Sequence, residues 1–231
     1  MWCFCLRIRY ILVLHPSNQR IPSDGEYHRG TSGPIVFGEG VPDWLVDCGT
    51  KSGLEVKVLK HDEMAAYQRG KLMVNLNNAV NALSGISLYE QIGNWYCRNV
   101  TADAYSEALA VFEAADLRVI NPMGKLPLRL ILAVMKSPDF LFNLAGSAFV
   151  AIDKKATSSM QEDLRLKRNT EINELNGYIA KLGRQHGVQT PVNDTLCGLI
   201  NEAERKRMGS PQISPDILYS KVQEALNSTS P

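Results

Sequence analysis

Apolar residues recur with the spacing of an α-helix over most of the chain. From His61 onward they return every three or four positions, first at Met64 and Tyr67 and then along a stretch that ends near Ser84-Gly85. Residues 34–38 form a short apolar run and residues 54–59 alternate between apolar and charged side chains, so both segments predict strands. Residues 41–48 between them have a helical pattern. The sequence therefore predicts a mainly α protein, with an all-helical domain over residues 62–231 after a small α/β segment over residues 1–61.

Several boundaries are recognisable in the helical region. Thr101 is a good N-cap for a helix that runs through Leu117. Glu171 lies in a helix that ends at His186-Gly187. A capping hydroxyl followed by proline at the first helical position marks the start of each of the last two helices: Thr190-Pro191 and Ser214-Pro215.

Residues 127–150 are strongly apolar and are interrupted at Ser137-Pro138. Charged side chains inside a membrane are costly, and this stretch contains Arg129, Lys136 and Asp139. It therefore predicts a buried pair of helices rather than a membrane span. The apolar residues 1–15 are too short and too interrupted by arginines for a span, which leaves a buried strand or a misplaced start as the alternatives.

Composition excludes few classes of protein. The 231 residues include 25 Lys+Arg and 24 Asp+Glu, so a net charge of +1 gives no reason to expect a nucleic acid or an anionic membrane as partner. The five cysteines are scattered, which favours a reduced, cytoplasmic compartment. Cys3 and Cys5 are not followed by further ligands at zinc spacing, so we expect no metal site.

The segment from Lys71 to Leu83 carries the most distinctive polar pattern. On a continuous helix, Lys71, Asn75 and Asn78 fall within about 60° of one another. Asparagine is a mediocre helix former, yet four of the seven residues from 75 to 81 are asparagine. A cation beside neutral amides suits a small anionic or carbonyl-bearing ligand. The sequence contains no G-x-G-x-x-G and no P-loop, and Gly38-Glu39-Gly40 is spoiled as a dinucleotide loop by Pro42.

Three segments together resemble ketopantoate reductase (2-dehydropantoate 2-reductase), specifically its helical C-terminal domain. They are Lys71–Asn75 with Asn81–Gly85, Ala156–Leu164 continuing through Ile172, and Asn176-Gly177 with His186–Asn193. The resemblance implies a helical domain similar to the C-terminal domain of 6-phosphogluconate dehydrogenase, after a remnant of an NADP-binding Rossmann-type domain. It also implies reduction of 2-dehydropantoate to pantoate, in pantothenate biosynthesis, with NADPH as the cofactor.

The same resemblance implies a role for individual residues. Lys71 would be the acid that protonates the carbonyl oxygen as hydride arrives. Asn75 would bind the hydroxyl and keto oxygens of the substrate, Ser159 its carboxylate, and Glu171 the ribose or nicotinamide side of the cofactor. The family's second substrate-binding asparagine aligns at Ala79, so Asn78 is the expected substitute.

Structural roles remain open for each of these residues. Lys71 alone is also typical of a lysine at a helix start, Ser159 is followed by Glu162 as in a capping box, and Glu171 suits the first turn of a helix. The run Arg165-Leu166-Lys167-Arg168 is typical of a solvated helix face, and a role on a cofactor phosphate is the alternative.

Two hypotheses follow. The first is an NADPH-dependent 2-keto acid reductase, whose partner is a small 2-keto acid and whose assembly as a homodimer is left open. The second is a non-catalytic helical interaction or dimerisation module derived from such an enzyme, because the family's glycine-rich cofactor loop has no counterpart in the sequence.

Overall fold

A computed structural model describes residues 13–14, 19–20, 28–29, 34–122, 124, 126–145 and 156–229. The chain divides into two compact units, Met1–Arg69 and Gly70–Pro231, which we call the N-terminal and C-terminal units. The predictions for residues 1–12 and for Cys3 and Cys5 lie outside the described residues. The expected domain boundary after residue 61 stays a prediction.

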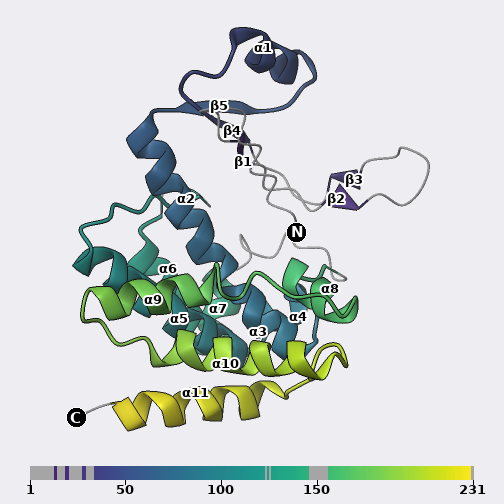
Figure 1. Cartoon of the computed structure of the whole chain (residues 1–231), viewed down its shortest axis with the longest axis vertical. Helices are drawn as coiled ribbons and strands as arrows, with labels where there is room; N and C mark the ends of the chain where they lie inside the picture. Colours follow the sequence, from purple (N-terminus) through teal and green to yellow (C-terminus); the bar gives the residue numbers. More distant parts are fainter. Residues whose placement is uncertain are drawn as a thin grey trace. The chain divides into compact units, whose positions relative to one another are not determined.

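The N-terminal unit contains a small sheet with the order β1-β4-β5 (Figure 1). Strand β4 (Ile35–Gly38) runs parallel to β5 (Val56–Leu59), and helix α1 (Asp43–Lys51) connects them. The short strand β1 (Val13–Leu14) pairs antiparallel with β4, and β2 (Gln19–Arg20) pairs with β3 (His28–Arg29). The predicted strand–helix–strand run is therefore confirmed. No residue of α1 is buried, and Trp44 is 68% exposed.

Helix α2 (His61–Asn75) begins at His61, the residue from which the sequence predicts a helical domain. The described residues of the C-terminal unit form helices and no strands, which confirms the mainly α fold. These helices are α3 (Asn77–Ser84), α4 (Leu88–Gly93), α5 (Trp95–Ala114), α6 (Leu128–Lys136), α7 (Asp139–Ala145), α8 (Ser159–Arg165), α9 (Asn176–Gln185), α10 (Pro191–Lys206) and α11 (Pro215–Thr229).

Helix α5 lies at the centre of the C-terminal unit and packs against α3, α4, α6, α9, α10 and α11. Helices α10 and α11 lie side by side (Figure 1). The core is built from apolar side chains that are almost completely buried, including Leu83, Phe112, Ile179, Leu196 and Leu218. Each such side chain contributes about 1.5–3 kcal/mol to folding when it leaves water.

Two boundaries differ from the prediction because of local capping. Helix α5 begins at Trp95 rather than after Thr101, since the Asn94 side chain accepts a hydrogen bond from the Cys97 amide. The Thr101 hydroxyl instead donates to the Cys97 carbonyl inside the helix. Helix α9 begins at Asn176, so Glu171 lies in the turn before it.

Helices α6 and α7 form the predicted pair, separated at Ser137-Pro138, but the prediction that the pair is buried is wrong. Only Ile131 and Phe142 are buried among their described side chains, while Phe140 is 71% exposed and Leu144 is 82% exposed. Residues 146–150 of the predicted stretch lie outside the described residues. No helix in the described part of the chain is long and apolar enough to cross a membrane.

Candidate functional site

The predicted lysine–asparagine helix is two helices joined by a tight turn at Leu76. The Leu76 amide donates to the Met73 carbonyl at 3.1 Å, a bond to the third residue back, and its ψ of −24° is that of a 3₁₀ turn. One such step turns the chain by about 120° instead of about 100°, so every residue after it is rotated by about 20°. A 3₁₀ turn inside a helix is frequent at functional hinges and at strained positions.

The three predicted residues differ in their exposure. Lys71 and Asn75 are partly exposed near the end of α2, whereas Asn78 is 7% exposed in α3. Ala79, where the family's second asparagine aligns, is completely buried in the hydrophobic core. A side chain at position 79 therefore has no access to a ligand, and Asn78 remains the candidate on this part of α3.

Helix α8 is held against α3 by hydrogen bonds from its N-terminal end. The Ser158 amide donates to Asn81 Oδ1 at 2.9 Å, and the Ser158 hydroxyl lies 3.4 Å from the Asn78 carbonyl. Gln161 Nε2 donates to the Gly85 carbonyl at 2.9 Å. These contacts bring Ser159, the first residue of α8, close to the helix that carries Asn78.

The alternative prediction, that Ser159 caps helix α8, is wrong because the preceding residue has this role. Ser158 is the N-cap of α8, because its hydroxyl accepts a hydrogen bond from the Gln161 amide at 3.1 Å. The Glu162 side chain pairs with Arg165 rather than with the cap. Within the described part of the chain the Ser159 hydroxyl makes no hydrogen bond, and its side chain is partly exposed. It is therefore available to a ligand.

Glu171 is exposed in the turn before α9, where its carbonyl accepts hydrogen bonds from Glu174 and Leu175. Partial desolvation raises the pKa of its carboxyl, and the nearby carboxylates of Asp163 and Glu174 raise this pKa further. Asp163 belongs to α8, so Glu171 lies near the helix that Ser159 begins. A carboxylate in this position suits hydroxyl or amide donors better than a phosphate.

Gly70 precedes Lys71 at a point where another segment touches α2. A Cβ atom at residue 70 would lie 1.8 Å from the Ile120 carbonyl oxygen and 2.9 Å from Pro122 Cδ. No side chain fits there without movement of the backbone, so glycine is required for this close contact. The segment around Ile120 thus supports the turn of α2 that presents Lys71.

A buried polar network, which no sequence pattern predicted, contacts the lysine–asparagine segment at the Leu76 carbonyl. Glu107 of α5 accepts hydrogen bonds from the amides of Val192 and Asn193 at 2.8 and 3.0 Å, so it caps the N-terminus of α10. Asn193 Nδ2 donates to Glu107 at 2.7 Å, and Asn176 Nδ2 donates to Asn193 Oδ1 at 3.0 Å. Burial raises the pKa of the Glu107 carboxyl to about 7. An isolated glutamate in a helix gives no sequence signal for such a role.

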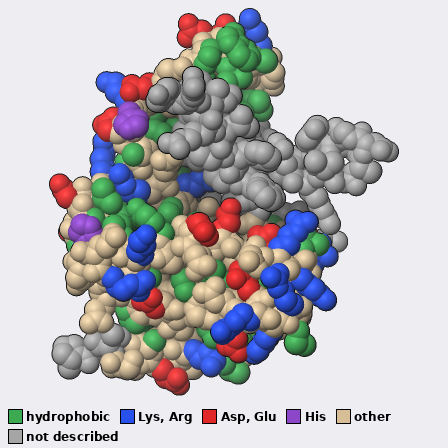
Figure 2. Space-filling model, viewed as in Figure 1, with side chains coloured by type: hydrophobic (Ala, Val, Ile, Leu, Met, Phe, Trp, Pro, Cys, Tyr) green, Lys and Arg blue, Asp and Glu red, His purple; other side chains and the backbone are tan. Residues whose placement is uncertain are grey.

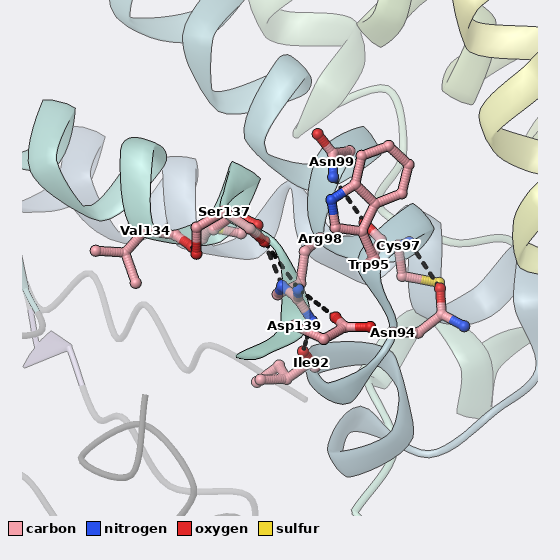
Figure 3. A network of polar contacts seen from close by, with 10 residues as sticks. Ile92, Asn94, Trp95, Cys97, Arg98, Asn99, Val134, Ser137 and Asp139 are labelled. Atoms are coloured by element: carbon pink, nitrogen blue, oxygen red, sulfur yellow. Dashed lines mark hydrogen bonds and ion pairs between the residues drawn. The ribbon is translucent and has the colours of Figure 1, made fainter. Parts of the chain in front are cut away.

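A second polar cluster surrounds Arg98, whose side chain is 2% exposed (Figure 3). Its guanidinium donates to the carbonyls of Ile92, Met135 and Ser137 at 3.0–3.3 Å and to Asp139 at 2.6 Å. It also lies 4.0 Å from the ring centroid of Phe142. Every contact of this cation is with the joint between α6 and α7 or with α4, so its role is structural.

Metal and thiol chemistry have little support in the described residues. No group of three or more His, Cys, Asp or Glu there is arranged to hold a metal ion. Burial raises the pKa of both Cys97 and Cys197 to about 12, so these thiols stay protonated. Basic and acidic side chains are interspersed over the C-terminal unit on the face shown in Figure 2.

A family model described as "Ketopantoate reductase PanE/ApbA C terminal" matches residues 63–204. A 2-dehydropantoate 2-reductase of Yersinia pestis is 28% identical over 152 residues, which cover 65% of this chain and 44% of that relative. A 2-dehydropantoate 2-reductase of Vibrio cholerae is 44% identical over 48 residues, or 21% of this chain and 16% of that relative. The chain spans less than half the length of these relatives.

Solved structures show the same fold. A PanE/ApbA family ketopantoate reductase from Ralstonia eutropha superposes with a TM-score of 0.63 at 20% identity, over 85% of this chain and 59% of that one. D-mandelate dehydrogenase with NADH has a TM-score of 0.63 at 19% identity, over 85% and 62%. A dimeric ketopantoate reductase from Staphylococcus aureus has a TM-score of 0.59 at 15% identity, over 85% and 62%.

Proposed function

The chain belongs to the ketopantoate reductase PanE/ApbA family through its C-terminal domain, and we propose that it takes part in the NADPH-dependent reduction of 2-dehydropantoate to pantoate. The observation that carries this proposal is the family match over residues 63–204, which includes Lys71, Asn75, Asn78, Ser159 and Glu171. Relatives that match are named 2-dehydropantoate 2-reductases. The proposed site lies on α2, α3, the start of α8 and the turn before α9.

Lys71 acts in this proposal as the proton donor. Hydride adds to the carbonyl carbon of the 2-keto acid, and negative charge develops on its oxygen. A lysine ammonium beside that oxygen stabilises the charge and then transfers a proton to it, which gives the hydroxyl group of the product. The position of Lys71 within a helix, next to the close contact at Gly70, supports a fixed direction for this proton transfer.

The neutral side chains orient the substrate. Asn75 is partly exposed one turn beyond Lys71, and its amide offers a donor and an acceptor to the keto and hydroxyl oxygens. The Ser159 hydroxyl donates to the carboxylate of the substrate, and Asn78 supplies the second amide. Holding the reacting groups in one geometry lowers a barrier by several kcal/mol, up to about 7–11 kcal/mol in the best cases.

The nicotinamide cofactor supplies the hydride when it is bound. Glu171 fits the ribose or carboxamide side of this cofactor, because it is an exposed acceptor beside further carboxylates. The described residues fit the phosphates less well, since the sequence has no glycine-rich dinucleotide loop. We propose NADPH rather than NADH as this cofactor.

We also propose that the protein is located in the cytoplasm. The free thiols of Cys48, Cys97 and Cys197 support this location.

The experiment that tests this function compares Lys71→Met with Lys181→Met. Lys181 is exposed on α9, and its replacement removes the same charge without changing a residue of the proposed site. We expect Lys71→Met to lower the rate of 2-dehydropantoate reduction by on the order of 10²–10⁴-fold, the usual contribution of a general acid. Lys181→Met should keep the wild-type rate. Equal rates in both variants would exclude Lys71 as the proton donor.

A second candidate function is a dimerisation module, and the exposed apolar residues of α6 and α7 favour it. Leu130, Phe140, Leu141 and Leu144 are each 44–82% exposed. A Staphylococcus aureus ketopantoate reductase of the same fold is described as dimeric. We propose that a second copy of this chain covers these residues. Light scattering should then give twice the monomer mass, and Phe140→Ser with Leu144→Ser should return the monomer.

A further inference from the structure

Tyr105 and Asn176 fix the backbone on both sides of Asn75, and we propose that they are positioning residues for the substrate. This inference rests on the proposed function, because it concerns how Asn75 is held for the 2-keto acid. Neither residue belongs to the predicted site, and both come from elements far from α2 in the sequence. Their contacts converge on the tight turn at Leu76.

Tyr105 holds the residue before Asn75. Its side chain is 3% exposed, and its hydroxyl donates to the Val74 carbonyl at 2.8 Å. A phenol buried this completely needs a polar partner, and here the partner is the backbone of the proposed site rather than another core group.

Asn176 holds the residue after Asn75. Its side chain is completely buried, and Nδ2 donates to Asn193 Oδ1 at 3.0 Å and lies 3.5 Å from the Leu76 carbonyl. Asn193 is in turn fixed by Glu107. The Leu76 carbonyl is therefore connected through two buried amides to a carboxylate on α5.

Two further side chains complete the pattern on α3. Gln91 Nε2 lies 3.4 Å from the Asn77 carbonyl, and the Ser158 hydroxyl lies 3.4 Å from the Asn78 carbonyl. Side chains from four separate segments thus bind carbonyls between residues 74 and 78. Val74 lies in the last turn of α2, where carbonyls need partners from outside the helix.

These contacts hold the backbone on either side of Asn75, but they do not involve the Asn75 side chain. It is partly exposed and makes no hydrogen bond within the described residues. A free amide on a held backbone is the arrangement that a pre-organised binding group requires, because ordering is complete before the ligand arrives. Loss of the Tyr105 hydroxyl should loosen Asn75 without removing any group that touches the substrate.

The test uses Tyr105→Phe in the full chain, with Tyr178→Phe as the matched control. Tyr178 is 39% exposed on α9 and makes no hydrogen bond within the described residues. We expect Tyr105→Phe to speed amide hydrogen exchange in residues 74–79 by about five-fold, the factor for one hydrogen bond of ordinary strength. We expect the Kd for 2-dehydropantoate, titrated with NADPH present, to rise by a similar or larger factor. The Kd for NADPH alone and all values for Tyr178→Phe should stay at wild type.

The two readouts separate failure of this inference from failure of the proposed function. Unchanged exchange in residues 74–79, or faster exchange with an unchanged 2-dehydropantoate Kd, overturns the positioning role while leaving the reductase intact. If the wild-type chain binds neither compound, the proposed function fails, and substrate positioning fails with it. Faster exchange in Tyr105→Phe would then establish a purely structural clamp.

Discussion

Gly70→Ala tests the close contact that supports Lys71, because two effects of opposite sign meet at this position. Alanine is favoured over glycine inside a helix by about 1 kcal/mol. The new Cβ would lie 1.8 Å from the Ile120 carbonyl oxygen and 3.0 Å from its carbonyl carbon, far inside contact distance. These are backbone atoms, so a side-chain rotation cannot relieve the clash. Overpacking of this kind usually costs about 1–3 kcal/mol or more.

The clash should therefore exceed the gain in helix propensity, and we expect a net loss of up to about 2 kcal/mol. Gly198→Ala is the matched control. Gly198 lies inside α10, and a Cβ there would meet nothing within 4 Å, so this variant should gain about 0.5–1 kcal/mol. Urea unfolding followed by circular dichroism measures both. If Gly70→Ala is stabilised as much as Gly198→Ala, the contact with Ile120 does not exist as described.

Two further predictions concern the buried polar clusters. The pKa of Glu107 is raised to about 7 from an ordinary 4.5, so the stability it contributes is complete below pH 4.5 and is lost as the pH rises through 7. Glu107→Gln should therefore remove roughly 3 kcal/mol of pH dependence from urea unfolding between these values, and parallel pH profiles for wild type and variant would contradict this. Arg98→Ala should cost about 3–5 kcal/mol in thermal unfolding, because three carbonyls lose their donor. Asp139→Asn should cost about 0–1 kcal/mol because Asp139 is 60% exposed, and an equal loss in both variants would refute this account of the cluster.

Local patterns in the sequence were sufficient to predict most of the helices. The starts of α10 and α11 follow from a proline at the first helical position, and the end of α3 follows from Gly85, which adopts a φ of +72°. The placement of Lys71 and Asn75 on one helix follows from periodicity alone. These features depend on residues that are near one another in the chain.

Features that depend on distant residues were not predicted. The turn at Leu76 is set by donors such as Tyr105 and Asn176, which are 31 and 100 residues from their partners. The cap on α10 comes from Glu107 rather than from the Thr190 hydroxyl, which donates to Asp194 instead. The exposure of the apolar side chains of α6 and α7 likewise could not be predicted from their composition. Composition alone does not determine which side of a helix packs against the core.

We propose that this chain carries the substrate half of a nicotinamide-dependent 2-keto acid reductase. Calorimetric titration of the chain with 2-dehydropantoate, with and without NADPH, tests this proposal. We expect saturable binding of 2-dehydropantoate that NADPH strengthens and that Lys71→Met weakens. Absence of binding under both conditions would contradict it.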